Sequence, residues 1–461
     1  MYRRCSRGLL YERFLQRHGF VRAQSTVAAS QKPRPDPFKT LAPKLAELRT
    51  DLISMLGSGH PAINEIAKYY FLHPSKQVRP VIVLLLAQAT NGLGSDWNKK
   101  LWEAECENAG GRQEELNRPL SRPDVLNDWN PSMPANTANF DPKFAMHPAK
   151  PHRPPKPPPA YSNASVSRTL ANIVLPTQRR LAQIVEMMHT ASLLHDDVID
   201  ESALRRGAAS APASYGNKLS VLGGNFVLGR ASAALSRLGD GEVMELISSV
   251  LPNLVEGEIL QLREIKMDDD KAAVSAKHDV DVAKDILEKN ISGQRSRDAW
   301  NIYLQKTYLK TASLMAKGAR SAVVLGGCKE GEVWKEIAYA YGRNLGIAFQ
   351  LVDDVLDYES ASATLGKPGG ADLQLGLATG PALYAWEEFP EIGDLIQRKF
   401  DRPGDVELAR DYVLRSSGVQ RTRALAQAYA DKAKEVLQEL PDSEAKAGLE
   451  VLTERVIGRK S

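Results

Sequence analysis

The chain has 461 residues, of which 43% are hydrophobic and 25% are charged, and this composition is ordinary for a globular chain with one large domain or two. The 60 Lys and Arg residues nearly balance the 56 Asp and Glu residues, so the formal net charge of +4 does not favour nucleic acid binding. The three cysteines are scattered and odd in number, so neither a disulfide framework nor a zinc knuckle is indicated. The function must therefore be sought in local groups of residues.

The first 35 residues have the composition of a mitochondrial targeting presequence. They contain several arginines and only one acidic residue, Glu12, with serines and apolar residues between them. A disordered basic tail is the alternative, but arginine without acid favours targeting, and hence the mitochondrial matrix. No apolar run reaches the roughly 18 to 20 residues of a membrane-spanning helix, so we expect at most peripheral contact with the inner mitochondrial membrane. The arginines of the first 30 residues are Arg3, Arg4, Arg7, Arg13, Arg17 and Arg22.

Helices are the regular elements that the sequence predicts from residue 36 onwards. The first has leucines at three- and four-residue spacing from Leu41 to Leu52, the second ends near Pro74 and the third opens at Pro80. Strand alternation is not convincing anywhere, so we expect an all-α bundle. Further helices are expected over residues 181–197, 219–238, 241–264, 303–325, 332–356 and 376–386.

Two segments interrupt this helical pattern. Residues 98–170 are rich in proline, asparagine and serine, and we expect a disordered or loosely packed insertion that holds no packed helix. A linker between two domains is the alternative, but too few helices precede it to close a core. Residues 266–297 contain many charges and are expected to form a surface excursion. The predicted organisation is a presequence, 1–35, and one interrupted helical domain, 36–461.

Two aspartate motifs share one spacing. In HTASLLHDDVIDESALRRG, residues 189–207, an apolar run is followed by aspartates at positions i, i+1 and i+4, of which the outer two share a helical face. FQLVDDVLDY, residues 349–358, repeats this spacing. Carboxylates at a helix C-terminus oppose the helix dipole, and a bound cation would relieve this repulsion. One such motif would usually be exposed helix charge, whereas two predict a metal site. The aspartates are Asp196, Asp197, Asp200, Asp353, Asp354 and Asp357.

Basic residues near these motifs complete a possible diphosphate site. Mg²⁺ usually joins one or two carboxylates to substrate phosphates, while arginine and lysine bind diphosphate directly. Each cation alone would most often be a solvated surface residue. Together with two metal motifs they predict a cavity for two diphosphates, one held by metal and one by basic side chains. The candidates are Lys76, Arg79, Arg205, Arg206, Lys310, Thr311 and Lys367.

Such a cavity favours one type of reaction. Metal ions stabilise the charge on a leaving diphosphate, so an allylic substrate can ionise to a delocalised carbocation. In a dry apolar pocket the cation would be attacked by the double bond of a second substrate. A proton must then leave, and the released diphosphate is the nearest base.

At these residues the sequence resembles the trans-isoprenyl diphosphate synthases, and most of all the mitochondrial long-chain polyprenyl diphosphate synthases of the hexaprenyl, solanesyl and decaprenyl types that make the ubiquinone side chain. HDDVID and GIAFQLVDDVLDY resemble the two aspartate motifs of that family, and VRP, RRG, YLKTASL and DLQLGLATGPALYA resemble its other signatures. The resemblance covers residues 38–97 and 171–461. It implies an isoprenoid-synthase-type all-α bundle with a central active-site cavity, normally a homodimer or hetero-oligomer, with Mg²⁺ as cofactor. It also implies a prenyltransferase that adds isopentenyl diphosphate units to farnesyl or geranylgeranyl diphosphate.

The resemblance implies a role for each matching residue. Asp196, Asp200 and Asp353 would bind magnesium, and the other three aspartates and Lys310 would support catalysis. Isopentenyl diphosphate would be held by Lys76, Arg79, His189 and Arg206. The allylic diphosphate would contact Arg205, Lys310, Thr311, Gln350 and Lys367.

Product length should depend on the wall of the cavity below Asp196. Ala191 and Ser192 lie about one turn earlier on the same helix, so the wall is small there, and the resemblance implies a long product. Met188, a further turn away, is flexible and would stop the chain only weakly.

Three alternative functions share part of this pattern. A non-catalytic subunit of a hetero-oligomeric synthase would have lost ligands that this chain retains. A shorter-chain farnesyl or geranylgeranyl diphosphate synthase is disfavoured by Ala191 and by the presequence. A terpene cyclase would not need a second diphosphate site at Lys76 and Arg79.

Overall fold

The computed structural model describes residues 34–73, 75–108, 116–121, 125, 127–131, 173–205, 207–264, 297–363 and 370–459. The predicted presequence and the predicted excursion over 266–297 lie outside these ranges, apart from their last one or two residues. Arg206 and Lys367 also lie outside them.

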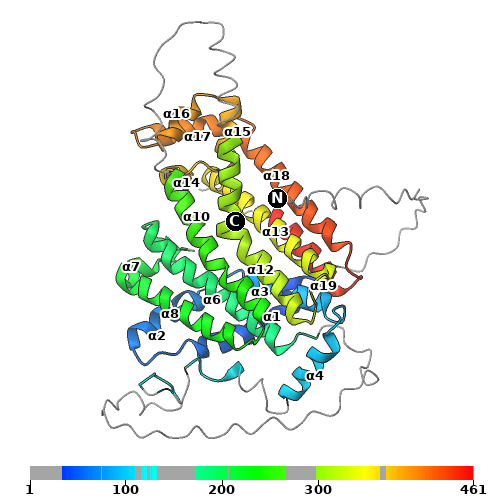
Figure 1. Ribbon diagram of the computed structural model, residues 1–461. Helices are drawn as coiled ribbons and strands as arrows, with labels where there is room; N and C mark the ends of the chain where they lie inside the picture. The colour runs from blue at the N-terminus through cyan, green and yellow to red at the C-terminus, as the bar shows by residue number, and fades with distance from the viewer. Residues whose placement is uncertain are drawn as a thin grey trace, which may run out of the picture. The chain divides into compact units, whose positions relative to one another are not determined.

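The described part of the chain is all-α, as predicted, with one short hairpin (Figure 1). Residues 297–307 are helical and lead into the π-helical turn η2, Tyr308–Ala312. The hairpin pairs β1, Leu204–Arg205, with β2, Ala208–Ala209, and is too short to be detected by alternation. The helices are α1 Pro37–Met55, α2 Pro61–Leu72, α3 Val78–Thr90, α4 Trp97–Asn108, α6 Pro176–Ile199, α7 Ala211–Tyr215, α8 Asn217–Ser236, α9 Gly241–Ser248, α10 Val250–Glu264, α12 Ser313–Leu325, α13 Val333–Ala363, α14 Ala371–Gln374, α15 Gly380–Glu388, α16 Ile392–Gln397, α17 Asp405–Arg415, α18 Gly418–Leu437 and α19 Glu444–Ile457.

Helix α3 lies at the centre of the bundle. Its sequence VRPVIVLLLAQAT is apolar on every side, and a helix of this kind is stable only when other helices surround it. Helices α6, α12 and α19 pack against it, and α13 packs against α12 and α18 (Figure 1). This arrangement brings the two helices that carry the aspartate motifs, α6 and α13, to the same part of the core.

Two predicted helices differ from the observed ones in an instructive way. The helix predicted over 241–264 is broken at Ser249, because Pro252 has no backbone N–H and its ring would clash with the carbonyl of Ser248. Helix α13 does not end near residue 356 but continues to Ala363, since alanine and glutamate sustain a helix after the apolar pattern stops. The second aspartate motif therefore lies inside its helix, and the dipole argument applies only to the first motif.

The expectation that residues 98–170 hold no packed helix is wrong for the part that the structure describes. Helix α4 extends to Asn108, and its Leu101 and Ala104 are buried in one cluster with Trp97. Leu116 and Leu120 belong to the main core cluster. Composition misled here because a few apolar residues at helical spacing suffice to anchor a proline-rich segment.

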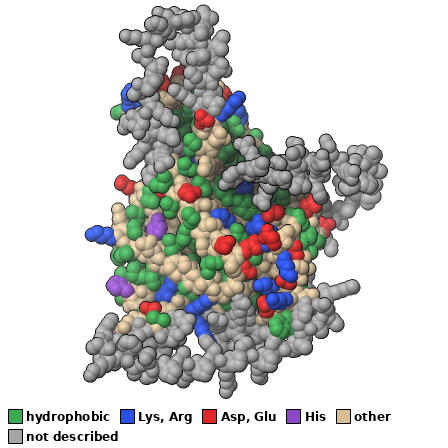
Figure 2. All heavy atoms as spheres, viewed as in Figure 1, with side chains coloured by type: hydrophobic (Ala, Val, Ile, Leu, Met, Phe, Trp, Pro, Cys, Tyr) green, Lys and Arg blue, Asp and Glu red, His purple; other side chains and the backbone are tan. Residues whose placement is uncertain are grey.

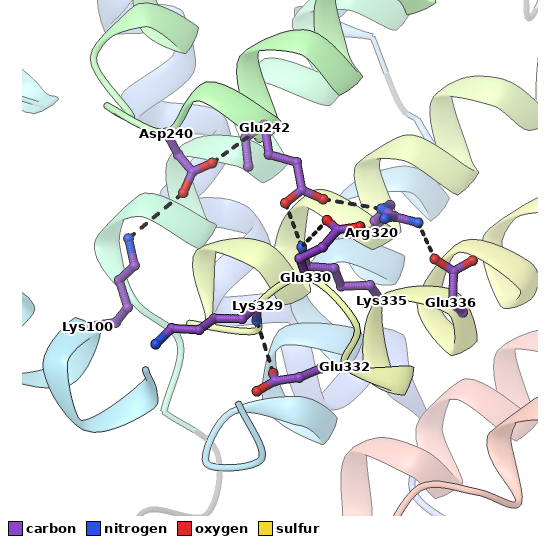
Figure 3. Close-up of polar contacts among 10 residues, drawn as sticks. Lys100, Asp240, Glu242, Arg320, Lys329, Glu330, Glu332, Lys335 and Glu336 are labelled. Carbon is purple, nitrogen blue, oxygen red and sulfur yellow. Dashed lines mark hydrogen bonds and ion pairs between the residues drawn. The ribbon is translucent and has the colours of Figure 1, made fainter. Parts of the chain in front are cut away.

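Charged residues join α4 and the start of α13 to neighbouring helices (Figure 3). Lys335 is buried, and its Nζ lies 2.6 Å from Oε2 of Glu242 on α9. Arg320 on α12 also pairs with Glu242, and Lys100 on α4 lies 3.9 Å from Asp240. This network fixes one end of the bundle.

The surface carries charge of both signs. On the face in Figure 2, basic and acidic side chains are mixed with hydrophobic ones, in keeping with the small net charge. Among the helices of the described ranges, none is long and apolar enough to span a membrane.

Candidate active site

A cavity of about 940 Å³ opens between α6, α13, η2 and the start of α3. Both aspartate motifs and residues from both groups of predicted basic residues line it. The structure thus brings together segments that are more than 100 residues apart in the sequence. The predicted site residues on its wall are Lys76, Arg79, His189, Ser192, Asp196, Asp200, Arg205, Lys310, Thr311, Gln350, Asp353 and Asp354.

The first motif ends helix α6 and presents its outer two aspartates to the cavity, as the spacing predicts. Burial raises the pKa of Asp196 to about 6, with Lys310 opposing the shift and Glu258 adding to it. Burial also raises the pKa of Asp200. These carboxylates carry unfavourable negative charge that a divalent cation would neutralise.

Asp197, which lies between Asp196 and Asp200 in the sequence, points away from the cavity. Its carboxylate is fully buried and accepts hydrogen bonds from Arg205 Nε, at 2.7 and 2.8 Å, and from the hydroxyl of Tyr70. The structure therefore gives Asp197 a contact with Arg205 rather than a place on the cavity wall.

The second motif presents its first two aspartates to the cavity. Asp353 lies 3.0 Å from the guanidinium of Arg459, and burial still raises its pKa. Asp354 accepts hydrogen bonds from Tyr303 and from Gln350 Nε2, the latter at 2.9 Å, and burial raises its pKa as well. Asp357 instead accepts from the backbone N–H groups of residues 371 and 372, at 3.1 and 3.3 Å, and so holds the start of α14.

Lys310 and Thr311 lie on the π-helical turn η2, and such turns often occur at functional sites. Lys310 Nζ donates to Glu258 and, at 3.0 Å, to Gln261 of α10. The close approach depends on Gly257, since a Cβ there would lie 2.7 Å from the Lys310 side chain. Thr311 Oγ1 donates to Gln350 at 2.8 Å. The turn thus connects α10 with the second motif.

Lys76 and Arg79 reach the cavity from the segment that precedes and opens α3. This segment turns sharply at Gln77, whose φ of 46° is left-handed and uncommon for a residue with a side chain. Both cations therefore lie on the wall that also carries His189 of α6.

The residues proposed to control product length are placed differently from one another. Ser192 lines the cavity, whereas Ala191 and Met188 are buried in the main core cluster. Glu186 and His189, which lie earlier on α6 than Ala191, also line the cavity, so it follows this helix past Ala191 without including that side chain among its described lining residues.

Sequence reasoning missed several residues on or beside the cavity wall. Asp372 is an example: burial raises its pKa, and Asp354 and Asp357 add to the shift. Little in the sequence marked these residues as functional, because neither aspartate motif contains them. The missed residues are Tyr70, Glu258, Gln261, Tyr303, Lys306, Asp372 and Arg459.

The residues present fit a magnesium ion that is shared with substrate. Within the described residues, no three His, Cys, Asp or Glu side chains are close enough to enclose a metal by themselves. Mg²⁺ needs no such cage, since it commonly takes one or two carboxylates, waters and substrate phosphates. Asp196, Asp200 and Asp353 supply hard oxygen ligands, and burial raises the pKa of each of them although basic side chains lie nearby.

The chain is similar to known proteins over most of its length. A family model described as "Polyprenyl synthetase" matches residues 163–413. The "Probable hexaprenyl pyrophosphate synthase, mitochondrial" of Yarrowia lipolytica is 43% identical, covering 96% of this chain and 88% of the relative. The "Hexaprenyl pyrophosphate synthase, mitochondrial" of Saccharomyces cerevisiae is 39% identical, covering 92% of this chain and 91% of the relative.

A solved structure has the same fold. It is that of a polyprenyl synthase from Caulobacter crescentus CB15 complexed with calcium and isoprenyl diphosphate, with a TM-score of 0.61, 24% identity and coverage of 94% of this chain and 100% of that one. Since the family model matches more than half of this chain and the relatives align over nearly all of it, the chain belongs to the polyprenyl synthetase family.

Proposed function

We propose that this protein is a trans-prenyltransferase that condenses isopentenyl diphosphate units onto farnesyl or geranylgeranyl diphosphate. The product is a long-chain all-trans polyprenyl diphosphate for the ubiquinone side chain. One observation carries the proposal: residues of both aspartate motifs and of both basic groups line a single cavity. The names of the similar proteins from Yarrowia and Saccharomyces support the long chain.

We assign the two diphosphates to different residues of the cavity. Asp196, Asp200 and Asp353 would hold Mg²⁺, and metal bound there would neutralise the diphosphate of the allylic substrate. Isopentenyl diphosphate would be held without metal by Lys76, Arg79, His189 and Arg206. The allylic diphosphate would also contact Arg205, Lys310, Thr311, Gln350 and Lys367.

The side chains of this protein would promote the condensation in three ways. Arg205 and Lys310 stabilise the growing charge on the leaving diphosphate by hydrogen bonds aimed at its oxygens. Lys76 and Arg79 hold the second substrate so that its double bond faces the allylic carbon, which replaces a bimolecular encounter by a positioned one. Leu193 and Phe349 provide apolar wall that excludes water from the carbocation. The proton lost after attack passes to the released diphosphate.

The alternatives are less well supported. A non-catalytic subunit does not need the acidic and basic residues that line the described part of the cavity. A farnesyl or geranylgeranyl diphosphate synthase is disfavoured by the long-chain names of the relatives that align over most of this chain.

The relatives are named mitochondrial, and this supports a mitochondrial location. We infer that residues 1–35 are a cleaved presequence and that the protein acts in the matrix, with at most peripheral contact with the inner membrane. Residues 36–461 would then form the catalytic domain, interrupted at 98–170 and 266–297. We also infer a homodimer or hetero-oligomer. Val255 and Ile259 lie one turn apart on α10 with exposed fractions of 62% and 45%, and a second subunit would cover them.

The decisive experiment incubates the purified chain, without its presequence, with Mg²⁺, farnesyl diphosphate and labelled isopentenyl diphosphate, and then sizes the products. We expect a ladder that ends in one long polyprenyl diphosphate. Products of 15 or 20 carbons would favour the shorter-chain alternative. No incorporation by folded protein would favour the non-catalytic subunit.

A further inference from the structure

Arg205 reaches the cavity from an element with little stability of its own. It lies on β1, which pairs with β2 through only two residues on each strand, Leu204 with Ala209 and Arg205 with Ala208. Even a full-length isolated hairpin is only marginally stable in water. The position of the Arg205 guanidinium must therefore be fixed by contacts outside the hairpin.

Asp197 supplies the first of these contacts. Arg205 Nε donates to both carboxylate oxygens, and a second guanidinium nitrogen pairs with Oδ1, so the fork is held in one plane. The Asp197 side chain has no exposed surface, whereas that of Arg205 is 25% exposed. The pair thus has a buried end and an end that faces the cavity, and the buried carboxylate requires further hydrogen bonds to keep its place.

Tyr70 supplies one of them from a different helix. Its hydroxyl, on α2, donates to Asp197 Oδ2 and accepts at 2.8 Å from the backbone N–H of Ala211, just after the hairpin. Burial, and then the adjacent carboxylate, raise the pKa of Tyr70, so the hydroxyl remains a donor at neutral pH. Neither Tyr70 nor Asp197 is among the described residues that line the cavity.

We propose that Tyr70 is a positioning residue for Arg205, because it fixes the Asp197 carboxylate that holds the guanidinium at the cavity wall. The proposal rests on the proposed function, in which Arg205 binds the allylic diphosphate. Tyr70 thereby acts on a substrate that it does not touch, through a chain of contacts that joins α2, α6 and the hairpin.

The test replaces Tyr70 by phenylalanine, which keeps the ring and removes only the hydroxyl. The matched control is Tyr341→Phe, which removes another buried tyrosine hydroxyl, one that donates at 3.0 Å to the carbonyl of Leu449 away from the cavity. Binding is measured by calorimetry with Mg²⁺ and farnesyl thiolodiphosphate, whose bridging sulfur prevents ionisation. KM for farnesyl diphosphate and kcat are measured in parallel.

We expect Tyr70→Phe to raise Kd and KM for the allylic ligand roughly 3- to 10-fold, which is less than a direct hydrogen bond to a charged group is worth, because Tyr70 reaches the ligand only through Asp197 and Arg205. KM for isopentenyl diphosphate should not change, and Tyr341→Phe should bind like the wild type. An unchanged Kd in folded Tyr70→Phe would overturn the proposal. If Tyr70→Phe does not fold, Asp197→Asn tests the same series of contacts. Unchanged affinity of Asp197→Asn for the allylic ligand would also overturn the proposal.

A second comparison separates positioning from general stability. In an Arg205→Lys background, where the planar fork is absent, Tyr70→Phe should raise Kd no further. An equal rise in both backgrounds would show that Tyr70 does not act through Arg205. If Arg205→Lys alone leaves Kd unchanged, the assignment of Arg205 to the allylic diphosphate fails, and this outcome is distinct from a failure of the Tyr70 proposal.

Discussion

Replacement of Asp196 by asparagine should abolish condensation and yet stabilise the metal-free protein. The carboxylate lies on the cavity wall, where burial raises its pKa, with further contributions from Glu258 and Asp200. Asparagine has nearly the same shape and no charge. The variant would therefore lose a magnesium ligand and, at the same time, a desolvation penalty.

The size of the expected gain in stability follows from the pKa shift of Asp196. The pKa of Asp196 rises from 3.8 to about 6, and at 1.36 kcal/mol per unit the ionised side chain costs about 3 kcal/mol of folding free energy. Because the unfolded chain loses its proton first as pH rises, the cost begins near pH 4 and is complete above about pH 7. At pH 5 it is about half as large.

Urea unfolding with EDTA present, at pH 8 and pH 5, measures this difference. Asp196→Asn should be more stable than the wild type by about 3 kcal/mol at pH 8 and by about half that at pH 5. Asp411→Asn removes an exposed carboxylate and should change stability by less than about 0.5 kcal/mol. A variant no more stable than the wild type, or a gain that is independent of pH, would refute the reasoning.

Three further predictions concern the site and the core. Asp353→Ala should reduce the rate of condensation more than about 1000-fold with the helical circular dichroism unchanged, whereas Asp357→Asn, which affects only the start of α14, should reduce that rate about tenfold or less. Equal losses of activity would show that both aspartates bind metal. Leu116→Ala should destabilise the protein by about 3 kcal/mol in urea unfolding, whereas Leu408→Ala, at an exposed position, should cost less than about 0.5 kcal/mol, and a loss below about 1 kcal/mol for Leu116→Ala would contradict its burial. For the same reason, deletion of residues 98–170 should not leave a stable fold. Glu242→Gln should cost about 2 kcal/mol because it leaves the buried Lys335 ammonium with a weaker partner, and Lys335→Met in the same chain should restore part of the loss; additive effects would argue against the pair.

Much of the fold could be predicted from local patterns. Apolar residues at helical spacing indicated the bundle, and the run in VRPVIVLLLAQAT indicated a buried helix, because these patterns depend only on helical geometry. Pro252 shows the limit of prediction from apolar spacing. It breaks the predicted helix because it has no backbone N–H, and the spacing of apolar residues does not reveal this.

The aspartate motifs were also evident in the sequence, because their spacing and their place after apolar runs are local properties. The role of each aspartate was not. Asp197 and Asp357 have the same chemistry as their neighbours, yet one is turned towards Arg205 and Tyr70 and the other holds the start of α14. The direction in which each aspartate side chain points depends on what packs against its helix.

Tertiary structure alone decided which distant residues complete the site. Glu258 meets Lys310 across 52 positions, and Tyr70 meets Asp197 across 127. The sequence around each of these residues indicates neither the partner that it meets nor the purpose of the contact. Only packing of the helices fixes such contacts, because burial makes an unpaired polar group costly and so selects the one arrangement in which these groups meet.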